Sequence, residues 1–87
     1  MTNSTQYTQK DVETWLIDRV ATYGNRPKED ISTTRPLAEL GLDSVYALAL
    51  CGEIEDSFQL EVDPTIAWDH PTIEALAEEL VQRLNHD

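Results

Sequence analysis

The chain has 87 residues, of which 40% are hydrophobic, and a formal net charge of −11. This length supports one folded domain but is too short for a deep catalytic cavity walled by several layers, so an enzyme is disfavoured. The strong negative charge repels nucleic acid and anionic membrane surfaces, so neither is expected as a partner. A lone cysteine, the lack of a membrane-length apolar run and the lack of a secretory signal predict a cytoplasmic protein.

A first helix is predicted over about Gln9 to Tyr23. Thr8 can cap this helix with Asp11 three residues on, and apolar side chains then recur at helical spacing. Gly24 is expected to end it. The polar segment from Asn25 to Pro36 is long for a connection, and we expect it to cross the bundle, held by a few apolar anchors. Those anchors are Ile31, Leu37 and Leu40.

A second helix is predicted from Ser44 to about Phe58. Asp43 is a good N-cap residue, and Gly41 allows the unusual backbone angles of the turn before it. At 100 degrees per residue, one broad face of this helix is apolar and is expected to enter the core. That face contains Ala47, Leu48, Leu50, Cys51, Ile54 and Phe58.

The opposite side of the second helix carries small or apolar groups where a solvated helix normally places charges. These residues are Val45, Ala49, Gly52 and Asp56. A glycine in mid-helix costs about 1 kcal/mol relative to alanine. Close approach of another surface would explain Gly52, and a tolerated substitution would explain it equally well.

A short third helix is predicted over Thr65 to Trp68, with Pro64 at its start. Pro71 then interrupts the chain, and a fourth helix begins that carries one amphipathic stripe. The stripe contains Ile73, Leu76, Ala77, Leu80 and Leu84. The predicted fold is all-α, a small four-helix bundle with three main helices and one short helix. The domain should cover residues 8–84, with flexible tails at 1–7 and 85–87.

Two motifs carry a family resemblance. The first is Leu40-Gly41-Leu42-Asp43-Ser44, and the second is Trp68-Asp69-His70-Pro71-Thr72-Ile73-Glu74-Ala75-Leu76-Ala77. With the spacing between them, these motifs resemble those of the acyl carrier proteins, and specifically the carrier domains of polyketide synthases. The resemblance covers about Thr8 to Leu84.

The resemblance implies that Ser44 bears a 4'-phosphopantetheine arm and that the chain has no catalytic residues or resident metal of its own. A phosphopantetheinyl transferase would attach the arm, and Asp43 would cap the helix and contact magnesium in that complex. The arm would carry acyl groups as thioesters for polyketide or specialised fatty acid or lipid synthesis. Expected partners are a ketosynthase, an acyltransferase or an acyl-activating ligase, which would meet a monomeric carrier.

The first half of the second helix lacks the acidic residues that freestanding fatty acid carriers usually place there. Apolar contact with partners through Val45, Ala49 and Gly52 is therefore expected beside the serine. The whole expected partner surface consists of Leu42, Val45, Ala49, Gly52 and Asp56. The chain resembles a discrete protein, although an excised module would look the same.

Three alternatives to an acyl carrier remain. The first is a peptidyl or aryl carrier of a non-ribosomal peptide pathway. The second is an acidic helical interaction module without a prosthetic group, which explains the charge but leaves the first motif coincidental. The third is a small hydrolase that uses Ser44 and His70, for which no further triad member or oxyanion site can be argued from spacing.

Overall fold

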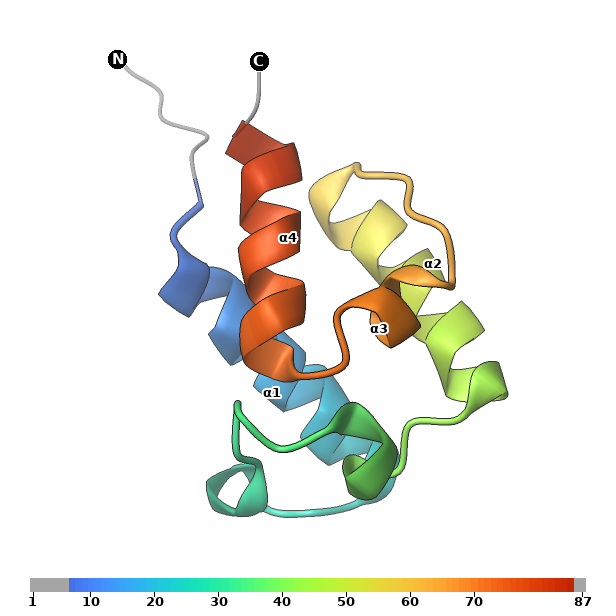
Figure 1. Cartoon of the computed structure of the whole chain (residues 1–87). Coiled ribbons are helices and arrows are strands. Elements are labelled where there is room, and N and C mark those ends of the chain that lie inside the picture. The colour runs from blue at the N-terminus through green and yellow to red at the C-terminus, as the bar shows by residue number, and fades with distance from the viewer. Residues whose placement is uncertain (1–6, 86–87) are drawn as a thin grey trace.

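The computed structural model describes residues 7–85, which fold into four α-helices (Figure 1). These are α1 (Gln9–Gly24), α2 (Ser44–Phe58), α3 (Ile66–Asp69) and α4 (Ile73–Asn85). Two 3₁₀ turns, η1 (Lys28–Asp30) and η2 (Leu37–Leu40), lie in the connection between α1 and α2. Within residues 7–85 the only strand-like pairing is an isolated antiparallel bridge between Pro36 and Thr72. The predicted all-α bundle is therefore confirmed.

The two ends of α1 are set by local hydrogen bonds. The predicted capping box is confirmed, because the Asp11 N–H donates to Thr8 Oγ1 at 3.0 Å and the Thr8 N–H donates to the Asp11 carboxylate at 3.2 Å. The predicted stop at Gly24 is wrong. Gly24 is helical, and the residue that takes the left-handed conformation is Asn25, with φ of 56°. Asparagine tolerates this conformation better than most residues, so it can end a helix as glycine does.

The connection between α1 and α2 is fastened to the core by its apolar anchors. Ile31, Leu37 and Leu40 are all buried, as predicted. Two backbone hydrogen bonds also join the connection to the start of α4: the Leu37 N–H donates to Pro71 O at 2.7 Å, and the Glu74 N–H donates to Thr33 O at 2.9 Å. The long polar segment is thus held by a few defined contacts.

The short helix begins later than predicted. The Asp63 carboxylate accepts hydrogen bonds from both the N–H and the hydroxyl of Thr65, each at 3.1 Å. This aspartate turn keeps Pro64 and Thr65 outside the helix, so α3 starts at Ile66 rather than Thr65 and ends at Asp69 rather than Trp68. Ile66 and Ala67 are the residues that α3 buries.

The first and last described residues are joined. The Tyr7 N–H donates to Asn85 Oδ1 at 3.1 Å, and Asn85 Nδ2 donates to Tyr7 O at 2.9 Å. The Tyr7 ring also meets Phe58, at the end of α2, edge-on with centroids 5.2 Å apart. Tyr7 and Asn85 therefore belong to the packed fold rather than to the expected tails, whose residues 1–6 and 86–87 lie outside the described residues. None of the described helices is long and apolar enough to cross a bilayer.

Candidate functional site

The segment before α2 is a turn that is anchored on one side and open on the other. Gly41 ends η2 with φ of 102°, a backbone conformation that other residues rarely adopt. Leu42 then enters the core, with 6% of its surface exposed, and its N–H donates to Leu37 O at 3.0 Å. Asp43 is extended and exposed, and Ser44 follows as the first residue of α2, also exposed. Burial of Leu42 thereby fixes the place where the Ser44 hydroxyl meets solvent.

Asp43 caps α2, as predicted. Its Oδ1 accepts a hydrogen bond from the Tyr46 N–H, and its backbone oxygen accepts one from the Ala47 N–H, both at 2.8 Å. A helix cannot pair its first N–H groups internally, so those of Ser44 and Val45 face the helix end. These groups and the positive end of the helix dipole favour an anion on the Ser44 oxygen. The donor set therefore fits a phosphate ester at Ser44.

The start of α2 is locked to the end of α1 by two aromatic rings. Tyr46 is only 3% exposed, and its ring stacks on that of Tyr23 with centroids 3.7 Å apart and an interplanar angle of 12°. Sequence reasoning did not place Tyr46 in the core, and its amphipathic aromatic side chain gave no clear signal. Burial raises the pKa of the Tyr46 hydroxyl, and the charge of Glu53 adds to the effect. The phenol thus stays protonated and cannot serve as a base for Ser44.

Cys51 and His70 do not form a reactive pair with Ser44. Cys51 is buried in the core face of α2, and burial, with a smaller contribution from Asp63, raises the pKa of its thiol. The His70 imidazole lies 3.7 Å from Glu79, which in turn pairs with Arg83 at 2.7 Å. Among the described residues no hydrogen bond joins His70 to Ser44, and no cluster of three metal-ligating side chains occurs. The geometry gives a hydrolase no catalytic arrangement.

The expected partner surface needs two corrections. Leu42 belongs to the buried core, so its side chain offers almost no surface to a partner. Leu48 was expected in the core but is 61% exposed. The core-facing side of α2 is rotated toward Tyr46 by the stacking on Tyr23, which leaves Leu48 outside. The other residues of the expected surface, Val45, Ala49, Gly52 and Asp56, are exposed.

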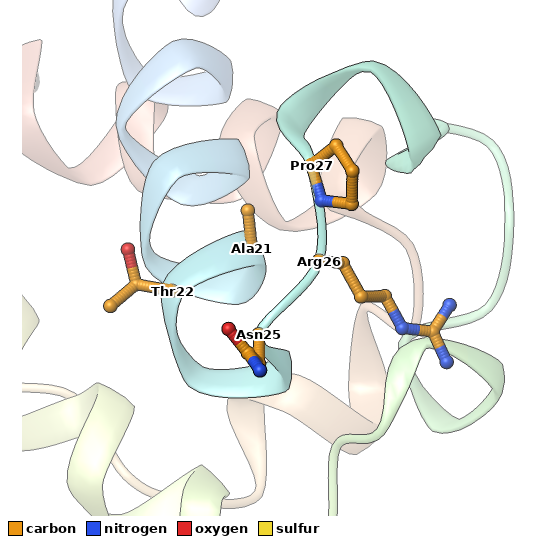
Figure 2. Close-up of a pocket in the computed structure, with 5 residues that line it drawn as sticks. All are labelled: Ala21, Thr22, Asn25, Arg26 and Pro27. Atoms are coloured by element: carbon orange, nitrogen blue, oxygen red, sulfur yellow. The ribbon is translucent and has the colours of Figure 1, made fainter.

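Two hollows lie elsewhere on the surface. One, of about 490 Å³, is at the end of α1 and is lined by Ala21, Thr22, Asn25, Arg26 and Pro27 (Figure 2). The other, of about 480 Å³, lies between the segment after α2 and the last turns of α4, lined by Leu60, Glu79, Gln82 and Arg83. Neither is lined by Ser44. Ser44 itself is exposed at the start of α2.

Comparison with known proteins agrees with this geometry. The sequence profile of the family described as "Phosphopantetheine attachment site" matches residues 14–80. The chain is 40% identical to the acyl carrier protein LipD of Actinoplanes friuliensis, with a TM-score of 0.74 and all of both chains covered. It is 38% identical to a free-standing peptidyl carrier protein of Acinetobacter baumannii, with a TM-score of 0.84, covering 88% of this chain and 96% of that one.

A third similar protein is much longer, a component of the phenolphthiocerol/phthiocerol polyketide synthase of Mycobacterium tuberculosis. The chain is 40% identical to it over 67% of the chain's own length. The chain spans only 3% of the length of the curated relatives it matches first. Taken with the helical bundle and the exposed serine, these matches show that the chain belongs to the phosphopantetheine-binding carrier proteins. The family is non-catalytic in general, and its cofactor is 4'-phosphopantetheine.

Proposed function

We propose that Ser44 is the residue that carries the 4'-phosphopantetheine arm. The observation that supports this assignment is the exposed hydroxyl at the capped start of α2, inside the segment that matches the family. An ester at this position keeps its phosphate charge in solvent and near unpaired backbone N–H groups. Three features (the capped helix, the buried Leu42 and the stacked Tyr46) hold the hydroxyl in place without covering it.

The arm would be transferred from coenzyme A by a separate enzyme. Ser44 Oγ would bond to the phosphorus of the phosphopantetheine half, the pyrophosphate bond of coenzyme A would break, and adenosine 3',5'-bisphosphate would leave. Between Gly41 and Gly52 the chain has no histidine and one carboxylate, that of Asp43, which is engaged as the cap. The proton of the Ser44 hydroxyl would therefore pass to a base on the transferase. The Asp43 carboxylate oxygen that does not accept the cap hydrogen bond would contribute to binding a magnesium ion in the complex with the transferase.

The cargo would be an acyl intermediate of polyketide synthesis or of specialised lipid synthesis, carried as a thioester at the end of the arm. The similarity to a polyketide synthase and to an acyl carrier supports this assignment. The carrier would act in the cytoplasm as a monomer without activity of its own. It would meet a ketosynthase, an acyltransferase or an acyl-activating ligase in turn.

A peptidyl carrier is the second candidate, and the similarity to a free-standing peptidyl carrier protein favours it. The two candidates differ only in the cargo. Loading the arm-bearing protein with an acyl-activating ligase or with an amino-acid-activating enzyme, and following the intact mass, separates them.

The attachment itself is tested by intact mass spectrometry after incubation with coenzyme A, magnesium and a phosphopantetheinyl transferase. The wild type should gain the mass of one phosphopantetheine group, and Ser44→Ala should gain none. Ser57→Ala is the matched control, since Ser57 is an exposed serine in the last turn of the same helix. An unmodified wild type, or a modified Ser44→Ala, would contradict the proposal.

A further inference from the structure

Aromatic rings join α1 to α2 at two places, one at each end of α2. Tyr23, near the end of α1, stacks on Tyr46 with ring centroids 3.7 Å apart and an interplanar angle of 12°. Trp15 meets Phe58 edge-on, with ring centroids 4.9 Å apart and an interplanar angle of 68°. Tyr46 lies two residues after Ser44, whereas Phe58 is the last residue of α2. The first contact therefore holds the end of α2 that carries the serine, and the second holds the opposite end.

The first turn of α2 depends on Tyr46 for its place in the fold. Tyr46 and Ala47 are the residues of that turn whose side chains are buried, and alanine contributes only a methyl group. The Tyr46 N–H also donates to Asp43 Oδ1 at 2.8 Å, so the ring contact and the helix cap meet in one residue. A shift of the Tyr46 ring would consequently move the backbone on which Ser44 lies.

Ring packing, and not a hydrogen bond, fixes the orientation of the Tyr46 side chain. Its hydroxyl is buried and has no hydrogen-bond partner among the described residues. Aromatic pairs stabilise a fold by more than the burial of their area alone. Tyr23 is itself 48% exposed, so its replacement removes no residue of the buried core but uncovers the Tyr46 ring.

We propose that Tyr23 is a positioning residue for the reaction at Ser44, acting through the Tyr46 ring from a different helix. The inference rests on the proposed function, because the reaction concerned is the transfer of the arm. Attack on phosphorus requires the Ser44 oxygen to be held about 3–3.5 Å away and in line with the bond that breaks. A first turn that is free to move satisfies this geometry for less of the time, so the chemical step slows. The affinity for the transferase does not depend on the stack, so kcat falls while KM stays.

Steady-state transfer of the arm to the full-length protein, with coenzyme A, magnesium and a phosphopantetheinyl transferase, separates the two parameters. Tyr23→Ala should lower kcat about tenfold at unchanged KM, since a small misplacement of a reacting group has a large effect on the rate. Tyr23→Phe keeps the ring and should restore kcat to within about twofold of the wild type. An unchanged kcat in Tyr23→Ala would overturn the proposal. A raised KM alone would also overturn it, because Tyr23 would then contact the enzyme directly.

Trp15→Ala is the matched control, because it removes the other aromatic contact between α1 and α2. It should lower the midpoint of urea unfolding and leave kcat as in the wild type, since Phe58 lies about 21 Å along the helix axis from Ser44. Trp15→Leu takes its place if the alanine variant does not fold. A loss of kcat equal to that of Tyr23→Ala would show a general effect of stability and overturn the proposal.

Hydrogen exchange followed by NMR tests the positioning without the transferase. In Tyr23→Ala the N–H groups of Tyr46 and Ala47 should exchange about tenfold faster relative to the N–H of Leu16, in the middle of α1. In Trp15→Ala that ratio should stay as in the wild type. An unchanged ratio in Tyr23→Ala would overturn the positioning role. A wild type that accepts no arm would instead refute the proposed function, and the exchange ratio would still decide whether Tyr23 holds the first turn.

Discussion

The cap of α2 can be tested by separating the hydrogen-bonding role of Asp43 from its charge. Asp43→Ala removes the 2.8 Å hydrogen bond from the Tyr46 N–H, and loss of an N-cap costs about 1 kcal/mol. For a domain of this size, that loss lowers the midpoint of thermal unfolding by about 4–8 °C. Asp43→Asn is the matched variant, since asparagine caps as well as aspartate, and its free energy of unfolding should stay within about 0.5 kcal/mol of the wild type.

The same two variants separate the cap from the proposed magnesium contact. Urea unfolding followed by circular dichroism gives the free energies of unfolding. Modification rates at several magnesium concentrations give the magnesium dependence of arm transfer. Asp43→Asn should keep the stability but require more magnesium, because an amide binds the ion more weakly than a carboxylate does. Wild-type stability in Asp43→Ala would refute the capping argument. An unchanged magnesium dependence in Asp43→Asn would refute the metal contact and leave the cap standing.

Three further predictions concern the fold. Tyr46→Phe should raise the midpoint of urea unfolding by the equivalent of about 1 kcal/mol, because the buried hydroxyl has no hydrogen-bond partner among the described residues; a lower midpoint would contradict this. Leu76→Ala should lower the free energy of unfolding by about 2–5 kcal/mol, since Leu76 is fully buried, and a calorimetric loss below 1 kcal/mol would contradict this. Hydrogen bonds from Arg19 and Lys28 hold the pKa of Asp18 below its usual 3.8, so its pairing stabilises the fold above that value and is lost as pH falls through the lowered pKa. Asp18→Asn should therefore lower the unfolding midpoint at pH 7 and have a progressively smaller effect as the pH falls below 3.8, and an equal effect at every pH would refute the assignment.

The parts of the fold that were predictable are those fixed by neighbouring residues. The capping box of Thr8 and Asp11, the N-cap at Asp43 and the full range of α2 follow from side chains within three or four positions of each other. The aspartate turn at Asp63 is also local, but the preference of proline for a first helical position suggested an earlier start for α3. The sequence around Asp63 therefore allows two starts for α3, one set by Pro64 and one set by the aspartate turn, and the structure has the second.

The exposure of α2 was less predictable, because it depends on how the helix is rotated against α1. The periodicity of α2 placed Leu48 inside and said nothing of Tyr46, whereas the structure has the reverse. The stacking of Tyr46 on Tyr23 joins residues 23 positions apart and has no sequence period. The partner surface itself stays a prediction; the structure shows that it included Leu42, which is buried, and omitted Leu48, which is exposed.

The most direct test of the central claim is the position of the arm in the modified protein. Cleavage after glutamate yields residues 40–53, which contain Ser44, and residues 56–61, which contain Ser57. Fragmentation mass spectrometry of these peptides should place one phosphopantetheine group on Ser44 and none on Ser57. An arm found on any other residue would contradict the account.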